Sequence, residues 1–407
     1  MFLRMLKFSW RSIWRNARRT VITGLAVGFG LASLLFTEAL MQGMTVHMIG
    51  ATTNPWMGDV QIHRRGFLDT RQLGLTVERP DAVLELLSQD TTIAAYTPRV
   101  LSPASLSSAR ELKPVTLTGV DMSTDPDVTL LESAVETGSY FTGDSMEMVL
   151  GYRLASDLKV ELGDVLVVTA ARTDSGLASS MFLLSGICNF GNEQLDRYSA
   201  FVNIGSARDL LQLGDAFHEI AIVLPDAHMA GDTSLALWDR YTDRENIAEG
   251  WTELAPQISS MLDLVNVSMV IMSAILFGLV IFGIVNSLFM SVYERMFELG
   301  IMKAVGTRPG TIGYMVIMEA FWLGVISTAT GLAIGLLIIW ITSGTGISFG
   351  EIEFSGITLS RPIFPELSPG RAWAYPVFTL LLTTLAGIFP GIHAARQNPA
   401  ESMRRSL

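Results

Sequence analysis

The chain has 407 residues, of which 49% are hydrophobic and only 16% are charged, whereas a soluble globular protein carries about a quarter charged residues. The composition therefore indicates a membrane protein, and the net charge of −11 argues against nucleic acid as a partner. A single cysteine excludes an intramolecular disulfide, and the five histidines have no zinc-binding spacing, so no metal site is predicted.

The first 20 residues predict a cytoplasmic amphipathic elbow helix. Six basic residues and no acidic ones occur in residues 1–20. Apolar side chains recur between them at helical spacing, which suits a helix lying at the lipid boundary: Leu3, Leu6, Trp10, Ile13 and Trp14. The segment is interpreted as a topology anchor or, alternatively, as an elbow that moves with a cytoplasmic partner.

Four apolar stretches are long enough to cross a bilayer, which takes about 20 helical residues. They are residues 21–44, 264–292, 312–342 and 372–392. Two acidic residues lie within them, and intramembrane acids are candidate functional residues. Glu38 lies near the outer boundary and is either functional or in contact with water. Glu319 lies about 10 Å into its span, where pairing with a basic group at the cytoplasmic edge is expected.

Lysine and arginine residues in the short flanks predict the orientation. Residues 1–20, the loop 293–311 and the tail 393–407 are basic, so they are expected in the cytoplasm together with both termini. Residues 45–263 and the connection 344–371 are then extracytoplasmic. The 45–263 segment has 14 basic and 31 acidic residues, a net charge of −17, so the acidity of the protein belongs to it.

The 45–263 segment is long enough to form its own core, in two lobes, and its pattern predicts an α+β domain. Strands are expected at 115–120, 165–169, 181–184 and 220–224, and helices at 81–87 and 206–213. The Gly and Pro content of 344–371 predicts a loop. The fold class is thus an α-helical membrane protein with four transmembrane helices and a large α+β extracytoplasmic domain between spans 1 and 2.

The loop between the second and third spans predicts a short coupling helix. Leu299, Met302, Ala304 and Val305 could form one face, and Gly306 with Pro309 would end it. Such a helix is suited to dock into a groove of a cytoplasmic motor, although composition alone does not distinguish this role from an interfacial turn. The candidate coupling residues are Phe297, Glu298, Leu299, Gly300, Ile301, Met302, Lys303, Ala304, Val305 and Gly306.

Two motifs carry a family resemblance. The run 297–306, FELGIMKAVG, resembles the coupling-helix signature of the FtsX-like, or MacB-type, permease family, and 393–404, HAARQNPAESMR, is similar to its closing segment. Within the large domain, residues 117–121, 149–164 and 186–196 most resemble the lipoprotein-releasing (LolC/LolE-type) permeases. Cys188 departs from that pattern, because an aromatic residue is common there.

The resemblance implies the partners. Members of the family pair two permease chains with two copies of an ABC ATPase, so a cytoplasmic ATPase dimer and a second permease chain, identical or paralogous, are expected. ATP and Mg²⁺ would be bound by the ATPase, because none of the four lysines here is followed by the Ser or Thr of a phosphate-binding Walker loop. This chain is therefore expected to be non-catalytic and to lie in the bacterial inner membrane.

The resemblance further implies that ATPase closure pushes on residues 297–306 and moves the extracytoplasmic domain. Lipidated protein cargo would pass from membrane lipids between spans 1 and 2 to a periplasmic carrier or adaptor, past candidate path residues Phe36, Leu40, Met44, Val267 and Ile271. Ordinary bundle packing is the alternative for each of these residues. Two further functions stay open: a signal transducer that activates periplasmic cell-wall hydrolases, and a MacB-like peptide or drug exporter.

Overall fold

The computed structural model describes residues 9–11, 13–143, 146–174, 176–232, 234–348, 352–354, 357–359 and 362–397, without the side chains of His228 and of residues 352–354 and 357–359. The chain forms two compact units. The helical unit comprises residues 1–46, 262–348 and 362–407. The inserted domain comprises residues 47–261 and 349–361.

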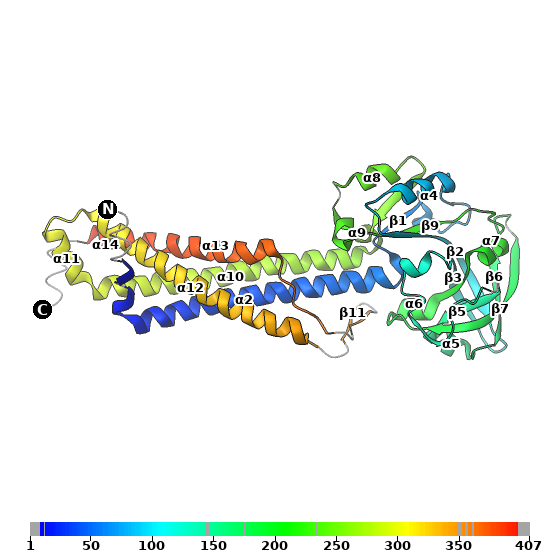
Figure 1. Ribbon diagram of the computed structural model, residues 1–407, viewed down its shortest axis with the longest axis horizontal. Helices are drawn as coiled ribbons and strands as arrows, with labels where there is room; N and C mark the ends of the chain where they lie inside the picture. Colours follow the sequence, from blue (N-terminus) through cyan, green and yellow to red (C-terminus); the bar gives the residue numbers. More distant parts are fainter. Residues whose placement is uncertain are drawn as a thin grey trace. The chain divides into compact units, whose positions relative to one another are not determined.

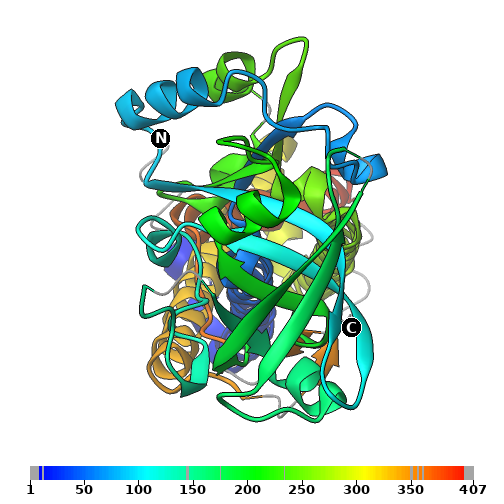
Figure 2. The ribbon, with the colours of Figure 1, turned by 90° about the vertical axis from the view of Figure 1, so that its right-hand side faces the viewer.

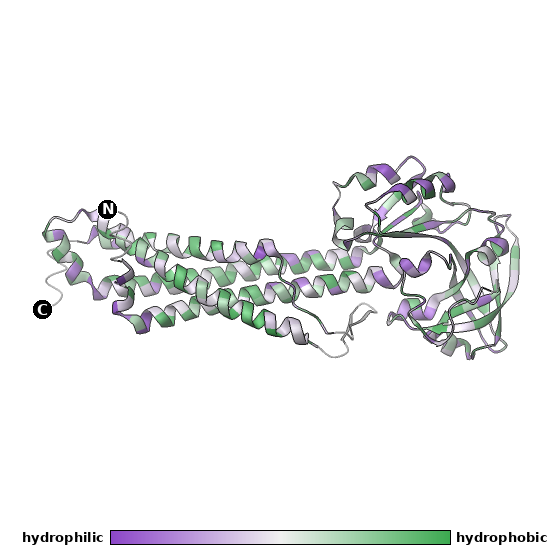
Figure 3. Ribbon diagram, in the orientation of Figure 1, coloured by the Kyte–Doolittle hydropathy of each residue, from purple (hydrophilic) through white to green (hydrophobic). Residues whose placement is uncertain are grey.

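Four helices in the described part of the chain are long and apolar enough to cross a membrane. They are α2 (Ala17–Thr52), α10 (Pro256–Glu294), α12 (Pro309–Thr345) and α13 (Pro369–Ala386), which α14 (Ile388–Arg396) continues. Figure 1 shows these helices, and Figure 3 shows the ribbon coloured by the hydropathy of each residue, with hydrophobic residues in green along them. The predicted fold class is confirmed, because the first helix lies near the N-terminus and the others follow residue 256, with a mixed α+β domain between.

The helices extend beyond the predicted apolar spans. α2 has 36 residues and α10 has 39, or about 55 Å each at 1.5 Å per residue, compared with a hydrocarbon core of about 30 Å. α2 already begins at Ala17, after helical residues 9–11 and 13–15 of the predicted elbow. The last span consists of two helical pieces that meet at Gly387, where a Cβ would come within 2.4 Å of the Ala320 side chain.

Two small-residue faces form the contact between α2 and α12. A Cβ on Gly331 would come within 2.7 Å of the carbonyl oxygen of Gly28, and one on Gly28 within 2.5 Å of Thr330 Oγ1. One turn further on, Gly335 packs against Ala32. Because no side chain separates the backbones, the helices approach closely and gain dispersion contacts along the seam.

The inserted domain contains a ten-stranded mixed sheet within the described residues (Figure 2). The strand order is β10-β1-β9-β2-β3-β8-β5-β7-β4, and β6 pairs with β2 and β7. Pairs β3/β8 and β5/β7 are parallel. The strands are β1 (Val60–Arg64), β2 (Ala95–Ser107), β3 (Leu112–Val120), β4 (Val135–Gly138), β5 (Glu147–Gly151), β6 (Val165–Ala171), β7 (Leu177–Cys188), β8 (Ser199–Asn203), β9 (Glu219–Val223) and β10 (Asn246–Gly250).

Short helices connect these strands. The α-helices are α3 (Phe67–Thr70), α4 (Pro80–Gln89), α5 (Tyr152–Leu158), α6 (Glu193–Tyr198), α7 (Ile204–Leu211), α8 (Ala236–Tyr241) and α9 (Trp251–Leu254). A π-helix, η1 (Thr53–Met57), follows α2, and η2 (Asp125–Asp127) and η3 (Ala227–Gly231) are 3₁₀ turns. All four predicted strands and both predicted helices are confirmed.

One continuous sheet joins the ten strands, and the division of this domain into two lobes stays a prediction. The expectation of a simple loop at 344–371 is wrong. The loop predicted at 344–371 contains a hairpin, β11 (Ile352–Phe354) with β12 (Ile357–Leu359), because alternating β-prone residues pair across it.

The alternation of side chains gives the sheet one apolar face and one polar face. Val60, Ile62, Ile220 and Ile222 are fully buried on the apolar face. α7 packs there, and at Gly119 an added Cβ would come within 2.6 Å of the Ala207 side chain. The opposite face of the same strands carries buried polar residues, described below as a cavity floor.

Candidate functional site

The predicted coupling segment forms α11 (Met296–Ala304), a short helix between α10 and α12. Gly306 has φ +103, a conformation that favours glycine, and the Thr307 N–H donates to the Met302 carbonyl across it (2.9 Å). Pro309 then begins α12. The helix therefore has a fixed end, as the Gly and Pro signals predicted.

The buried face of α11 differs from the predicted one. Leu299 is buried in a cluster with Val292, Ile312, Val316 and Ala394, and Met302 packs against it. Ala304 is exposed and Val305 is 84% exposed, so the prediction that these two share the packed face is wrong. The four-residue steps from Phe297 to Ile301 to Val305 instead align three exposed apolar side chains on one face.

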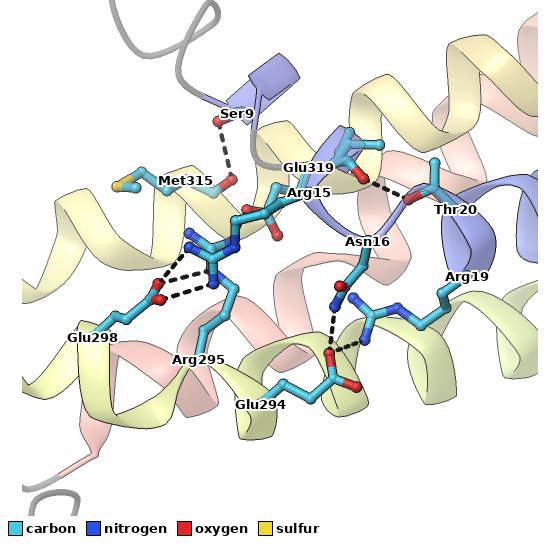
Figure 4. A network of polar contacts seen from close by, with 11 residues as sticks. Ser9, Arg15, Asn16, Arg19, Thr20, Glu294, Arg295, Glu298, Met315 and Glu319 are labelled. Atoms are coloured by element: carbon cyan, nitrogen blue, oxygen red, sulfur yellow. Dashed lines mark hydrogen bonds and ion pairs between the residues drawn. The ribbon is translucent and has the colours of Figure 1, made fainter.

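An arginine of the N-terminal segment binds the first turn of α11 (Figure 4). The Arg15 guanidinium donates to both carboxylate oxygens of Glu298, at 2.8 and 3.1 Å. This bidentate hydrogen bonding lowers the pKa of Glu298, and the charge of Arg15 adds to the effect. The N-terminal segment and α11 are thus connected by a directional contact.

Four further contacts surround this pair. Arg295 forms an ion pair with Glu319 of α12, and its Nε lies 3.6 Å from Glu298 Oε2. At the end of α10, Glu294 accepts from Arg19 (2.6 Å) and from Asn16 (2.8 Å). Figure 4 shows the side chains of three chain segments converging here. The basic partner expected for Glu319 is therefore Arg295.

The last turn of α11 is fixed to the C-terminal helix. Lys303 Nζ donates to the carbonyl oxygens of Ala395 (2.6 Å) and Gln397 (2.5 Å), at the end of α14. A lysine at this position also interacts favourably with the negative end of the α14 dipole. Of the second family motif, residues 393–397 are described and include this contact, whereas 398–404 lie outside the described residues.

The other intramembrane acid lies near the opposite end of the helical unit. Glu38 of α2 is buried, forms an ion pair with Arg371 of α13, and accepts a hydrogen bond from the Tyr375 hydroxyl (2.9 Å). Next to it, the Glu366 N–H donates to the Ala39 carbonyl (2.9 Å). Glu38 therefore connects the first and last spans, so the expectation that it simply reaches water is wrong.

The candidate path residues fall into two environments. Phe36 packs against a buried cluster in the bundle, together with Leu332, Leu367 and Tyr375. Leu40 and Met44 are half-buried on α2, whereas Val267 and Ile271 are exposed on α10. The geometry does not test whether these residues line a substrate path, so that role stays a prediction.

The sequence reasoning missed five charged partners. Arg15, Arg19, Glu294, Arg295 and Arg371 were either counted only as topology signals or left unassigned. The sequence pattern that could have identified them is the presence of opposite charges at the same end of different spans. An acid buried in one helix needs a cation from another helix. Among the described residues, no group of three or more His, Cys, Asp or Glu side chains could hold a metal ion.

Comparison with known families supplies the classification. Residues 270–399 match the FtsX-like permease C-terminal family, and residues 20–233, more than half of the chain, match the MacB-like periplasmic core domain. The chain belongs to the FtsX-like permease family. It is therefore a multi-pass ABC transporter permease with a MacB-type domain, a transmembrane subunit without a catalytic ATPase domain, and a partner ATPase is implied.

The chain is also similar to individual proteins. The lipoprotein-releasing system transmembrane protein LolC of Xylella fastidiosa is 22% identical over 93% of this chain and 92% of its own length. An uncharacterized ABC transporter permease of Methanocaldococcus jannaschii is 24% identical over 66% of this chain and 65% of its own. The periplasmic region of MacB from Actinobacillus actinomycetemcomitans is 14% identical, with a TM-score of 0.35, and covers 50% of this chain and 94% of that structure.

Proposed function

We propose that this permease converts ATP hydrolysis by a separate cytoplasmic ATPase dimer into movement of its inserted domain, which faces the periplasm. In this proposal the protein lies in the bacterial inner membrane with both termini in the cytoplasm, and ATP and Mg²⁺ bind only to the ATPase. A second permease chain, identical or paralogous, completes the assembly. The basic flanks 1–20, 293–311 and 393–407 support this orientation.

The observation that carries the proposal is the surface of α11. A short helix with one packed face normally turns polar side chains to water, yet α11 exposes Phe297, Ile301 and Val305 in one row. Because α11 lies between two membrane-spanning helices, it is outside the apolar part of either span. A row of apolar anchors at positions i, i+4 and i+8 is how a helix docks in a groove of a partner protein.

The contacts around α11 supply a route for the movement. Glu298 binds the N-terminal segment, Lys303 binds the end of α14, and Leu299 packs against α10 and α12. A push on α11 would therefore shift these elements together, because buried packing and charge-assisted hydrogen bonds resist separation. Glu319 contributes through Arg295, and Glu38 would keep the first and last spans moving as a pair.

For the cargo, we propose lipoproteins, extracted from the inner membrane and passed to a periplasmic carrier. The similarity to LolC over nearly the whole chain supports this choice. Extraction needs coupled work because each buried methylene of an acyl chain contributes about 0.8 kcal/mol. Acyl chains would enter between the first two spans, past Phe36, Leu40, Met44, Val267 and Ile271.

The docking role of α11 is tested with Val305→Glu and its matched control Val305→Leu, measured with the cognate ATPase in nanodiscs. Val305 is largely exposed, so both variants should insert and fold. We expect the glutamate variant to lose ATPase binding by about tenfold or more, because a charge would be buried in the interface, while leucine binds normally. Equal binding by both variants would contradict the proposal.

Two further variants test transmission after docking. Gly300→Pro breaks the middle of α11, and Lys303→Glu removes the contact with α14. We expect both variants to insert normally, while the ATPase bound to them hydrolyses ATP without cargo release. Cargo release at the normal rate by both variants would show that α11 does not transmit the movement.

The cargo is tested by ATP-dependent release of a lipoprotein from proteoliposomes to a soluble periplasmic carrier. Release that requires ATP and the carrier supports the lipoprotein assignment. Activation of a periplasmic hydrolase without release would favour a signal transducer instead. Transport of peptides or drugs with an adaptor would favour the MacB-like exporter, which the match to the MacB-like core domain also makes reasonable.

A further inference from the structure

The polar face of the sheet in the inserted domain is unusual because it is buried without being apolar. His63 of β1 lies opposite Glu219 of β9 and Ile247 of β10, and Gln61 lies opposite Glu249. Residues opposite each other across strands project to the same face. The register therefore gathers an amide, an imidazole and two carboxylates on one surface.

This surface is the floor of a concavity of about 1380 Å³ that lies within the inserted domain. Thr52, the last residue of α2, and Pro256, the first of α10, line it, and Gln194 and Tyr198 of α6 border it elsewhere. Sites for small molecules have about 300–1,000 Å³. The greater volume suits several residues of an extended polypeptide.

His63 provides unused hydrogen-bonding capacity in this cavity. Its residue surface is 1% exposed, and its Nε2 lies 2.7 Å from Glu249 Oε2. Its Nδ1 has no hydrogen-bond partner among the described residues. Because an unpaired polar atom is costly to bury, such atoms point to a ligand or an ordered solvent molecule.

The cavity lining also has an excess of negative charge. Asp69, Glu249 and Glu253 line the cavity, and burial raises the pKa of both glutamates. The nearby carboxylates add to this effect, Asp69 on Glu249 and Glu249 on Glu253. A cation placed between them would relieve both the repulsion and the loss of hydration.

The arginines of the lining are already engaged. Arg65 donates to the Asp243 carbonyl at 3.0 and 3.1 Å, and the Arg71 guanidinium lies 5.3 Å from the centre of the Phe67 ring. Glu219, the remaining acid of the floor, pairs with buried Arg99 (3.1 Å). Glu249 Oε2 already contacts His63, so the carboxylate groups left to receive a ligand are Asp69, Glu253 and the second oxygen of Glu249.

We propose that this cavity binds an extended basic segment of a partner polypeptide, with a lysine or arginine side chain at Glu249 and Glu253. The polar floor would accept the peptide backbone, and the net charge of −17 over residues 45–263 would attract the segment. Because the ends of α2 and α10 line the cavity, a change in their separation would widen or narrow it. The proposal does not depend on the identity of the cargo.

The test is peptide binding to the full chain in nanodiscs of phosphatidylcholine, which lacks the anionic lipid that would itself bind basic peptides. A fluorescent peptide of alternating lysine and serine is compared with a glutamate–serine peptide of equal length. We expect binding of the basic peptide only, weakened by salt. In Glu249→Gln/Glu253→Gln the affinity should fall about tenfold or more, because two charge-assisted hydrogen bonds are lost.

The matched control is Asp81→Asn/Glu85→Gln in α4, which makes the same charge change on exposed residues outside the cavity. Unchanged peptide affinity in this control supports the site. A loss of affinity equal to that of Glu249→Gln/Glu253→Gln would mean that only the overall charge of the domain matters, and it would overturn the proposal. Gln194→Trp at the cavity edge should also weaken binding, by obstruction. Spermidine that binds as tightly as the peptide would overturn the polypeptide assignment. The assay contains no ATPase, so its outcome is independent of the proposed transport function.

Discussion

The two acids buried in the spans are held in different ways. Glu319 pairs with Arg295, whose side chain is only 12% exposed, and Arg295 also approaches Glu298. Glu38 pairs with Arg371, whose side chain is 49% exposed, and it also accepts a hydrogen bond from the Tyr375 hydroxyl. The first pair belongs to a network of several segments around α11, whereas the second is a single clamp between α2 and α13.

This difference suggests different tasks. A network that ties α11 to the N-terminal segment, α12 and α14 distributes a local push, because each member restrains the next. A single half-exposed clamp keeps two helices in register but transmits less. Variants at each site should therefore differ in how they affect stability and coupling.

The largest effect is expected for Arg295→Leu. It leaves Glu319 buried without its cation, and removing one partner of a buried pair costs about 3 kcal/mol or more. Thermal unfolding in detergent should show the loss, and Arg295→Leu/Glu319→Leu should restore much of it. If the double variant is no more stable than the single one, the buried charge is not the cause.

A smaller loss, about 2 kcal/mol, is expected for Arg371→Leu. The half-exposed position of Arg371 lets water screen this pair, and Tyr375 still donates to Glu38. The same unfolding assay serves as the measurement, with Tyr375→Phe as a second variant to remove the remaining donor. A greater loss for Arg371→Leu than for Arg295→Leu would reverse the comparison.

A pH effect of about 1 kcal/mol per pH unit is expected in the inserted domain. His218 accepts the Leu101 N–H at Nδ1 and contacts the Leu73 carbonyl through Nε2 (3.0 Å). Burial lowers the pKa of His218 in the folded state. The contribution of neutral His218 to the free energy of unfolding is therefore fully present above the unfolded pKa of about 6.5, and it is lost as the pH falls below that value.

Hydrogen exchange of β2 and β9 peptides, corrected for the intrinsic rate, should show this loss. His218→Gln should make the free energy of unfolding depend less steeply on pH, by up to the effect of about one proton taken up on unfolding. His63, whose pKa burial also lowers, should maintain the remaining dependence on pH. An unchanged slope in the variant would mean that His218 does not titrate with unfolding.

The smallest stability effect, below about 1 kcal/mol, is expected for Arg15→Gln, because its pair with Glu298 is exposed. Its effect on coupling should be larger, since the N-terminal segment loses its hold on α11. The measurement is the ratio of cargo released to ATP hydrolysed, with Arg18→Gln as the control, because the exposed Arg18 lies in the same segment. A normal ratio in Arg15→Gln would remove the N-terminal segment from the transmission route.

Much of the fold was predictable because its signals are local. An uninterrupted apolar stretch requires a helix in lipid, since every backbone polar group must be paired. Gly306 and Pro309 marked the end of α11 because their backbone preferences are intrinsic. The packed face of α11 was not predictable, because Leu299 is buried by residues of α10, α12 and α14 that are distant in sequence.

The sequence by itself determined the number and order of the spans, the placement of an α+β domain between the first two, and the position of α11. These follow from hydropathy, spacing and turn residues within short windows of the chain. Only the tertiary structure decided which arginine neutralises Glu38 and which neutralises Glu319. It also decided that His63 of β1 contacts Glu249 of the neighbouring strand β10. Pairings of this kind depend on which distant segments are brought within hydrogen-bond distance, and no local propensity encodes that choice.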